Sequence, residues 1–177
     1  MENKLKKRIS ITAIALGLVF VGLVFFPAVI ILTGSRGWLA PPLPPGTLSD
    51  LLQVVQPTSI FNFIIALFTL RFNFWAMVVG TLGIMVLGHA VAVFVLGVIA
   101  LFKENVGAKY VRAIKHQAIV TAILFLLAVI GASIFAVGYN NRFEAWNLLP
   151  SLVVLALGLA GLIVSVVVLR TPKPVVQ

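Results

Sequence analysis

The chain has 177 residues, of which 62% are hydrophobic and only 10% are charged, and its formal net charge is +9. A chain this apolar needs a lipid environment in which apolar side chains can face outward, so a soluble globular protein is excluded. The absence of cysteine excludes disulfides and thiolate catalysis, and basic residues at the ends of apolar runs indicate membrane lipids, not nucleic acid, as their partner.

Four apolar runs predict an all-α integral membrane protein, a four-transmembrane-helix bundle that forms one membrane domain over 1–177. Each run lacks Lys, Arg, Asp and Glu and is long enough to cross the ~30 Å hydrocarbon core. The first run is too long for the apolar part of a signal peptide, so we expect it to be retained. The predicted spans are 9–32, 74–102, 117–139 and 148–169, with an outer loop over 33–73, a basic cytoplasmic loop over 103–116 and a cytoplasmic tail over 170–177.

Lysine and arginine predict the orientation of the bundle, because short cytoplasmic loops carry an excess of them. Ten of the 13 basic residues lie before the first span, between the second and third spans, or after the fourth, and three lie on the opposite side. Both termini are therefore expected in the cytoplasm (N-in, C-in) of a protein in the cell (plasma) membrane. The ten residues are Lys4, Lys6, Lys7, Arg8, Lys103, Lys109, Arg112, Lys115, Arg170 and Lys173.

The outer loop is the least regular part of the sequence. Its proline cluster at 41–46 cannot be helical. Leu48–Gln56 is predicted as a short helix, and Ser59 as the N-cap of a second one over Ile60–Leu70. Both are too short to span a membrane, and the chain is expected to break near 71–73 because one helix over 60–102 would be ~65 Å long. We therefore expect short interfacial or re-entrant helices between the first two spans.

Partner contacts are predicted in this outer segment. Polar and small residues recur at helical spacing on one face of the second short helix, which favours protein on that stripe and lipid elsewhere. Tryptophans at the outer ends of the spans fit an aromatic belt. The partner-contact candidates are Asn62, Ala66, Thr69, Asn73, Trp38 and Trp75.

His89 is the one ionisable residue near the middle of a predicted span, and such residues are functional candidates. It is a candidate ligand of a haem or pigment, or a proton carrier; the alternative is a neutral imidazole hydrogen-bonded to a neighbouring helix. His116 is placed at the cytoplasmic end of the third span. Since His89 is about 20 Å from that end of the second span, the two histidines are not expected to share a metal. No metal site and no other cofactor are predicted.

Catalytic machinery is not expected. The sequence has no nucleophile-elbow, P-loop or H-E-x-x-H motif, and no Asp or Glu within the predicted spans, so neither an enzyme nor an ion pump is predicted. The spans instead contain pairs of small residues four positions apart, which let helix backbones approach closely. These pairs are Ala76 and Gly80, Gly88 and Ala92, Ala128 and Ala132, Ala156 and Ala160, and Gly161 and Ser165.

The basic loop is predicted to contact anionic lipid headgroups, at ~1 kcal/mol for each residue near the surface. The residues concerned are Lys103, Lys109, Arg112 and Lys115.

Taken together, these features favour a non-catalytic accessory or structural subunit of a larger membrane protein complex. It would contact other membrane proteins, or further copies of itself, through the segment 48–73 and the small-residue helix faces. One alternative is an oligomeric transporter, channel or lipid-handling protein with a cavity lined by Asn73, Thr81 and His89. A second alternative is a haem- or pigment-binding subunit that uses His89. The layout is similar to that of claudin-like and tetraspanin-like four-helix proteins, but their outer-loop cysteines are missing, so the chain is assigned to neither family.

Overall fold

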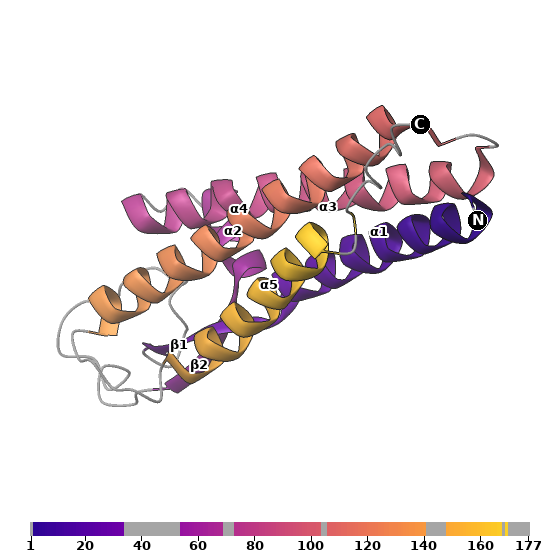
Figure 1. Cartoon of the computed structure of the whole chain (residues 1–177). Helices are drawn as coiled ribbons and strands as arrows, with labels where there is room; N and C mark the ends of the chain where they lie inside the picture. Colours follow the sequence, from indigo (N-terminus) through magenta and orange to yellow (C-terminus); the bar gives the residue numbers. More distant parts are fainter. Residues whose placement is uncertain are drawn as a thin grey trace, which may run out of the picture.

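Four long helices dominate the computed structural model, which describes residues 2–33, 54–68, 73–103, 106–140, 148–167 and 169. The helices run side by side along one axis (Figure 1), and each contains a stretch long and apolar enough to cross a membrane. They are α1 (Glu2–Phe25), α3 (Phe74–Phe102), α4 (Ala108–Asn140) and α5 (Leu149–Val167). The predicted multi-pass membrane bundle is therefore confirmed, and α3 has the bounds that the sequence predicted for the second span.

The first predicted span, 9–32, is wrong at its C-terminal end. The helix α1 ends at Phe25, and Pro27–Thr33 forms a strand, β1. Proline lacks the backbone N–H and disfavours a helical conformation in the residue before it, and the β-branched residues that follow suit a strand. Hydropathy alone could not reveal this change, because both parts of the run are equally apolar.

A two-stranded antiparallel sheet joins β1 to β2 (Val54–Ser59). The pairing runs from Pro27 opposite Ser59 to Thr33 opposite Val54, so β2 returns along β1. The predicted helix over Leu48–Gln56 is therefore wrong at 54–56, because these residues pair as a strand; residues 48–53 lie outside the described part.

A bulge at Ala28 ties β1 to the helices behind it. The register of the sheet shifts between Pro27 and Val29, which leaves Ala28 without a partner in the ladder. Its carbonyl accepts a hydrogen bond of 2.7 Å from the hydroxyl of Ser151 on α5, and this hydroxyl lies 3.0 Å from that of Ser133 on α4. The hydroxyls of Ser151 and Ser133 thus hold the bulged backbone against α4 and α5.

The short helix α2 (Ile60–Phe68) follows β2 directly. Ser59 and Asn62 form a reciprocal cap: the Ser59 N–H donates to Asn62 Oδ1 at 2.9 Å, and the Asn62 N–H donates to Ser59 Oγ at 3.4 Å. The helix begins directly after Ser59, the residue that the sequence predicts as its N-cap. The cap satisfies backbone N–H groups that the first turn of a helix leaves without a partner.

Two glycines of α3 allow α2 to pack closely against it. A Cβ atom on Gly80 would lie 2.5 Å from the carbonyl oxygen of Phe63, and one on Gly83 would lie 2.7 Å from Ile60 Cγ2. These glycines are about 9 and 14 Å along α3 from its first residue. Since Ile60 contacts the farther glycine, α2 begins between the long helices and runs back toward the start of α3.

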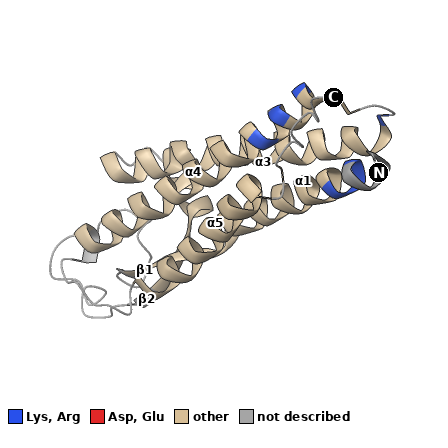
Figure 2. Ribbon diagram, viewed as in Figure 1, with Lys and Arg blue, Asp and Glu red and all other residues tan. Residues whose placement is uncertain are grey.

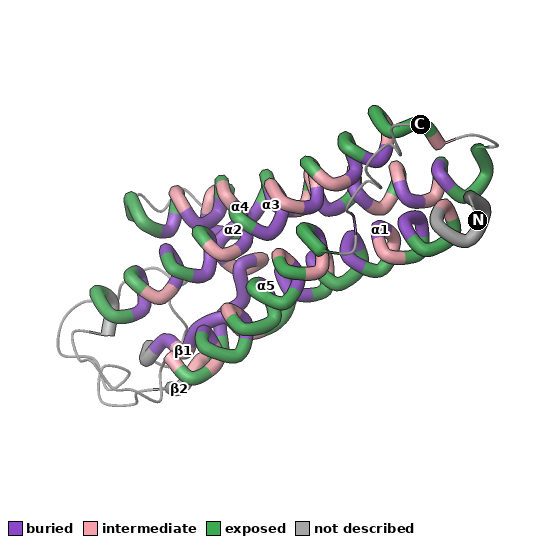
Figure 3. Tube along the Cα trace, in the orientation of Figure 1, coloured by how far each residue is buried: buried purple, intermediate pink, exposed green. Residues whose placement is uncertain are grey.

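The core consists of two clusters along the bundle. Figure 3 shows buried residues between the helices and exposed residues on their outward sides. One cluster joins α1, α3, α4 and α5, and includes an edge-to-face contact of Phe20 with Phe125 at 5.6 Å between ring centroids. The other joins β1, α2, α3 and α4, and includes Phe63 against Phe135 at 5.1 Å. The second cluster closes the end of the bundle that carries the sheet.

Basic residues mark the opposite end. Figure 2 shows lysine and arginine at the start of α1 and along the first turns of α4. Among the side chains that the structure describes there is no carboxylate. The described cations there are Lys6, Lys7, Arg8, Lys103, Lys109, Arg112 and Lys115.

Candidate functional site

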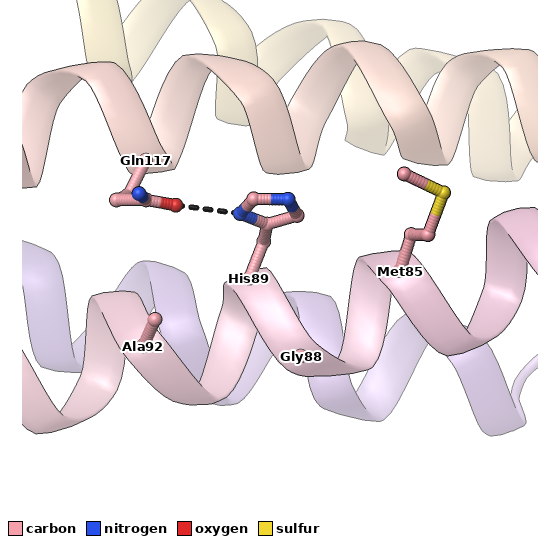
Figure 4. A pocket seen from close by; sticks show the side chains of 5 residues that line it. All are labelled: Met85, Gly88, His89, Ala92 and Gln117. Atoms are coloured by element: carbon pink, nitrogen blue, oxygen red, sulfur yellow. Dashed lines mark hydrogen bonds between the residues drawn. The ribbon is translucent and has the colours of Figure 1, made fainter.

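His89 on α3 is hydrogen-bonded to Gln117 on α4, with 2.5 Å between His89 Nδ1 and Gln117 Oε1 (Figure 4). An amide oxygen only accepts, so Nδ1 donates, and in the tautomer with one ring proton Nε2 has a lone pair. This geometry supports the interpretation of His89 as an imidazole that is hydrogen-bonded to a neighbouring helix. It also leaves one acceptor nitrogen for another group.

An open groove surrounds this pair. It has a volume of about 370 Å³ and is lined by Met85, Gly88, His89, Ala92 and Gln117; we call it the His89 groove. Figure 4 shows the imidazole and the amide side by side between α3 and α4, with Gly88 and Ala92 next to them on α3. Apart from the nearby backbone of α3 itself, no atom lies within 4 Å of a Cβ built on Gly88, so no side chain or neighbouring helix covers this part of the groove.

The groove faces away from the centre of the bundle. The α3 residues on the other side of the helix, Ala90 and Phe94, pack on Gly17 of α1, whereas Gly88 is exposed. Among the described residues, Ser10 Oγ is the one buried side-chain polar atom without a hydrogen-bond partner. The Nε2 of His89 and the amide nitrogen of Gln117 are therefore accessible at the groove surface.

The pair lies at the charged end of the apolar part of α4. Gln117 directly follows His116 and is about 14 Å from the first residue of α4, while His89 is about 20 Å from the last residue of α3. The two histidines lie at similar depths, because α4 begins at Ala108 and its basic turns lie beside the apolar second half of α3. His116 itself is exposed and does not line the groove.

The described residues contain no group of three side chains able to hold a metal ion. A haem or pigment at His89 would therefore depend on one protein ligand. The geometry allows it, since a metal-binding imidazole normally donates its other ring N–H to a fixed acceptor, as His89 does to Gln117.

A second pocket lies at the other end of α3. It has a volume of about 460 Å³ and is lined by Asn73, Trp75, Ile134, Phe135 and Gly138. The Asn73 side chain accepts from the N–H groups of Trp75 and Ala76, at 3.1 and 3.3 Å, and so caps α3. Neither this pocket nor the His89 groove includes Thr81, so the described structure does not bring Asn73, Thr81 and His89 into one cavity.

The predicted polar stripe does not form one helical face. Asn62 is used in the cap of α2, Ala66 is buried against the core, and Asn73 belongs to the cap of the next helix. Trp75 is exposed on α3. The remaining candidates, Trp38 and Thr69, lie outside the described residues. The stripe is not continuous because Asn73 lies at the start of α3, whereas Asn62 and Ala66 belong to α2, whose bounds are Ile60–Phe68.

The four basic candidates lie together at one end of the bundle. Lys103, Lys109 and Arg112 are exposed and Lys115 is partly exposed. Lys103 Nζ lies 5.2 Å from the ring centre of Tyr110, whose hydroxyl donates to the carbonyl oxygen of Leu96 at 3.0 Å. These contacts hold the α3–α4 connection and leave the cations available to anionic groups.

The serines Ser133 and Ser151 are expected as helix-packing hydroxyls, but sequence reasoning missed Gln117 and the contact of Ser151 with Ala28. Gln117 was treated as the first residue of a span, although an amide beside an apolar run is itself a signal for a hydrogen bond between helices. The contact of Ser151 with Ala28 could not be inferred, because it depends on a strand that the hydropathy pattern does not reveal.

Comparison with known proteins identifies no relative: no protein-family model, no curated protein and no solved structure matches the chain.

Proposed function

We propose that this chain is a non-catalytic accessory or structural subunit of a larger complex in the cell membrane. Both termini would lie in the cytoplasm, which is supported by the gathering of basic residues at the end of the bundle where α1 begins. Membrane lipids with anionic headgroups would contact Lys103, Lys109, Arg112 and Lys115.

The observation that carries this proposal is that some small residues pack against neighbouring helices of the chain and others do not. At glycines on the inward faces, atoms of neighbouring helices occupy the space that a Cβ would take, for example Phe63 at Gly80 and Phe20 at Gly161. Gly88 has no atom within 4 Å of a Cβ position. Ala156 and Ala160 on α5 are likewise exposed. Since small residues let helices approach closely in lipid, the unfilled positions suit partner helices outside the chain.

The outer segment supports the same function. Its helix α2 buries Ile60, Phe63 and Ala66, but Ile65 and Phe68 are exposed, the latter to 76%. Such side chains suit lipid or a partner membrane protein better than water. We place α2 in the membrane as a re-entrant element.

Purification from native membranes in a mild detergent tests this function. The proposal predicts that a second membrane protein co-purifies at a fixed molar ratio and is lost when Ala156 or Ala160, both exposed on α5, is replaced by leucine. A preparation that contains this chain alone, in any oligomeric state, would contradict it.

A haem- or pigment-binding subunit is the second candidate. It is supported by the free Nε2 of His89, held in place by the Nδ1 bond to Gln117. A visible absorption spectrum tests it, because a bound haem or pigment would give a band that His89→Ala removes. A colourless protein would refute it.

A further inference from the structure

We infer that the His89 groove is the contact between two copies of this chain, related by a two-fold axis along the membrane normal. The inference does not rest on the proposed function, since a pair of copies can act alone or within a larger complex. It rests on the hydrogen-bonding groups of the groove and on where they lie.

The groove offers one acceptor and one donor. Because Nδ1 of His89 donates to Gln117, the accessible Nε2 accepts, and the accessible amide nitrogen of Gln117 donates. A helix that covers the groove excludes water from these groups, and leaving buried polar groups unpaired is costly. A partner that covers the groove must therefore supply a donor opposite His89 and an acceptor opposite Gln117.

A second copy supplies both groups. In a two-fold contact every residue pair occurs twice, so His89 facing Gln117 of the partner implies Gln117 facing His89 of the partner. When two α3–α4 faces meet about an axis along the membrane normal, α3 of one copy lies opposite α4 of the other. His89 and Gln117 are hydrogen-bonded to each other and hence lie at one depth. The axis preserves that depth, so the two reciprocal bonds form at the same level.

The walls of the groove permit this approach. Gly88 and Ala92 on α3 are small, and a Cβ on Gly88 would meet no atom within 4 Å. On α4 the residue one turn before Gln117, Ala113, is also small and exposed. A facing helix can thus come close to α3 and α4 without displacing a large side chain.

Disulfide crosslinking tests this contact cleanly, because the chain has no cysteine. Two differently tagged chains, Ala92→Cys and Ala113→Cys, are co-expressed and oxidised in native membranes. The inference predicts a disulfide-linked dimer that contains both tags. The matched control pairs Ala92→Cys with Ala156→Cys, an exposed alanine on α5, and should give no such product. Failure of the first pair to crosslink, or equal crosslinking of both pairs, overturns the inference.

A second experiment tests the reciprocal bonds themselves. Tagged His89→Ala and Gln117→Ala chains are co-expressed. Neither homodimer can form a bond between copies, but the mixed dimer retains one, between His89 of one chain and Gln117 of the other. An interhelical bond of average strength in lipid raises the ratio of mixed dimer to each homodimer about threefold above the random 2:1.

The outcomes of this mixing experiment separate the explanations. If His89 and Gln117 act only within one chain, the mixed dimer stays at the random ratio, and the inference is refuted. A haem or pigment band that depends on His89 also refutes it, because the same Nε2 cannot serve both. The co-purification of another protein has no bearing on either result, so the proposed function can fail while this contact stands.

Discussion

Replacing Gly80 by alanine should loosen the contact between α2 and α3. The added Cβ would lie 2.5 Å from the carbonyl oxygen of Phe63 and 2.7 Å from Leu67 Cγ. The nearer atom belongs to the backbone, so α2 as a whole must shift. Overpacking of this kind costs about 1–3 kcal/mol, and alanine recovers at most about 1 kcal/mol of helix propensity. We therefore expect the free energy of unfolding to fall by about 1–2 kcal/mol.

Gly88→Ala is the matched control, because it adds the same atom to the same helix where nothing lies within 4 Å. It should leave the free energy of unfolding unchanged or slightly raised. Both variants can be compared by denaturant titration in dilute detergent, where association does not contribute. Equal stability of the two would show that α2 does not pack on Gly80, and the account of the re-entrant segment would be refuted.

Two further predictions concern β1 and the orientation. Ser151→Ala removes the donor to the buried Ala28 carbonyl and should lower the free energy of unfolding by about 1–3 kcal/mol. The control is Ser165→Ala, which should change the free energy of unfolding by less than about 1 kcal/mol, because the Ser165 hydroxyl donates to Gly161 of its own helix. Equal losses in the same titration would contradict this prediction. A single cysteine introduced by Lys109→Cys should react with a membrane-impermeant thiol reagent in inside-out vesicles and not in intact cells, and the reverse pattern would refute the proposed orientation.

The sequence predicts the membrane-spanning helices well because each is a continuous apolar run between charged or turn-forming residues. The bounds of α3 follow from such a run, and Asn73 before it is a favoured N-cap. The helix α4 begins at Ala108, before the predicted span at Gln117, because the helix continues through basic residues outside the apolar run. Hydropathy locates the apolar stretch and not the helix.

The candidate site could be predicted only in part. His89 stands out in the sequence as an ionisable residue within an apolar span. Its partner does not, since the pairing depends on the register between α3 and α4, which follows from the packing of whole helices. The β1 strand was missed for a related reason: Pro27 indicates a break, but only the return of β2 makes the residues after it a strand.

The mass of the particle released intact from native membranes tests the account most directly. Native mass spectrometry after gentle extraction should give a particle that contains two copies of this chain together with a second membrane protein. Conversion of Gln117 to alanine should shift the population toward particles with one copy. A particle that holds a single copy of this chain and no other protein would contradict both the proposed function and the two-fold contact.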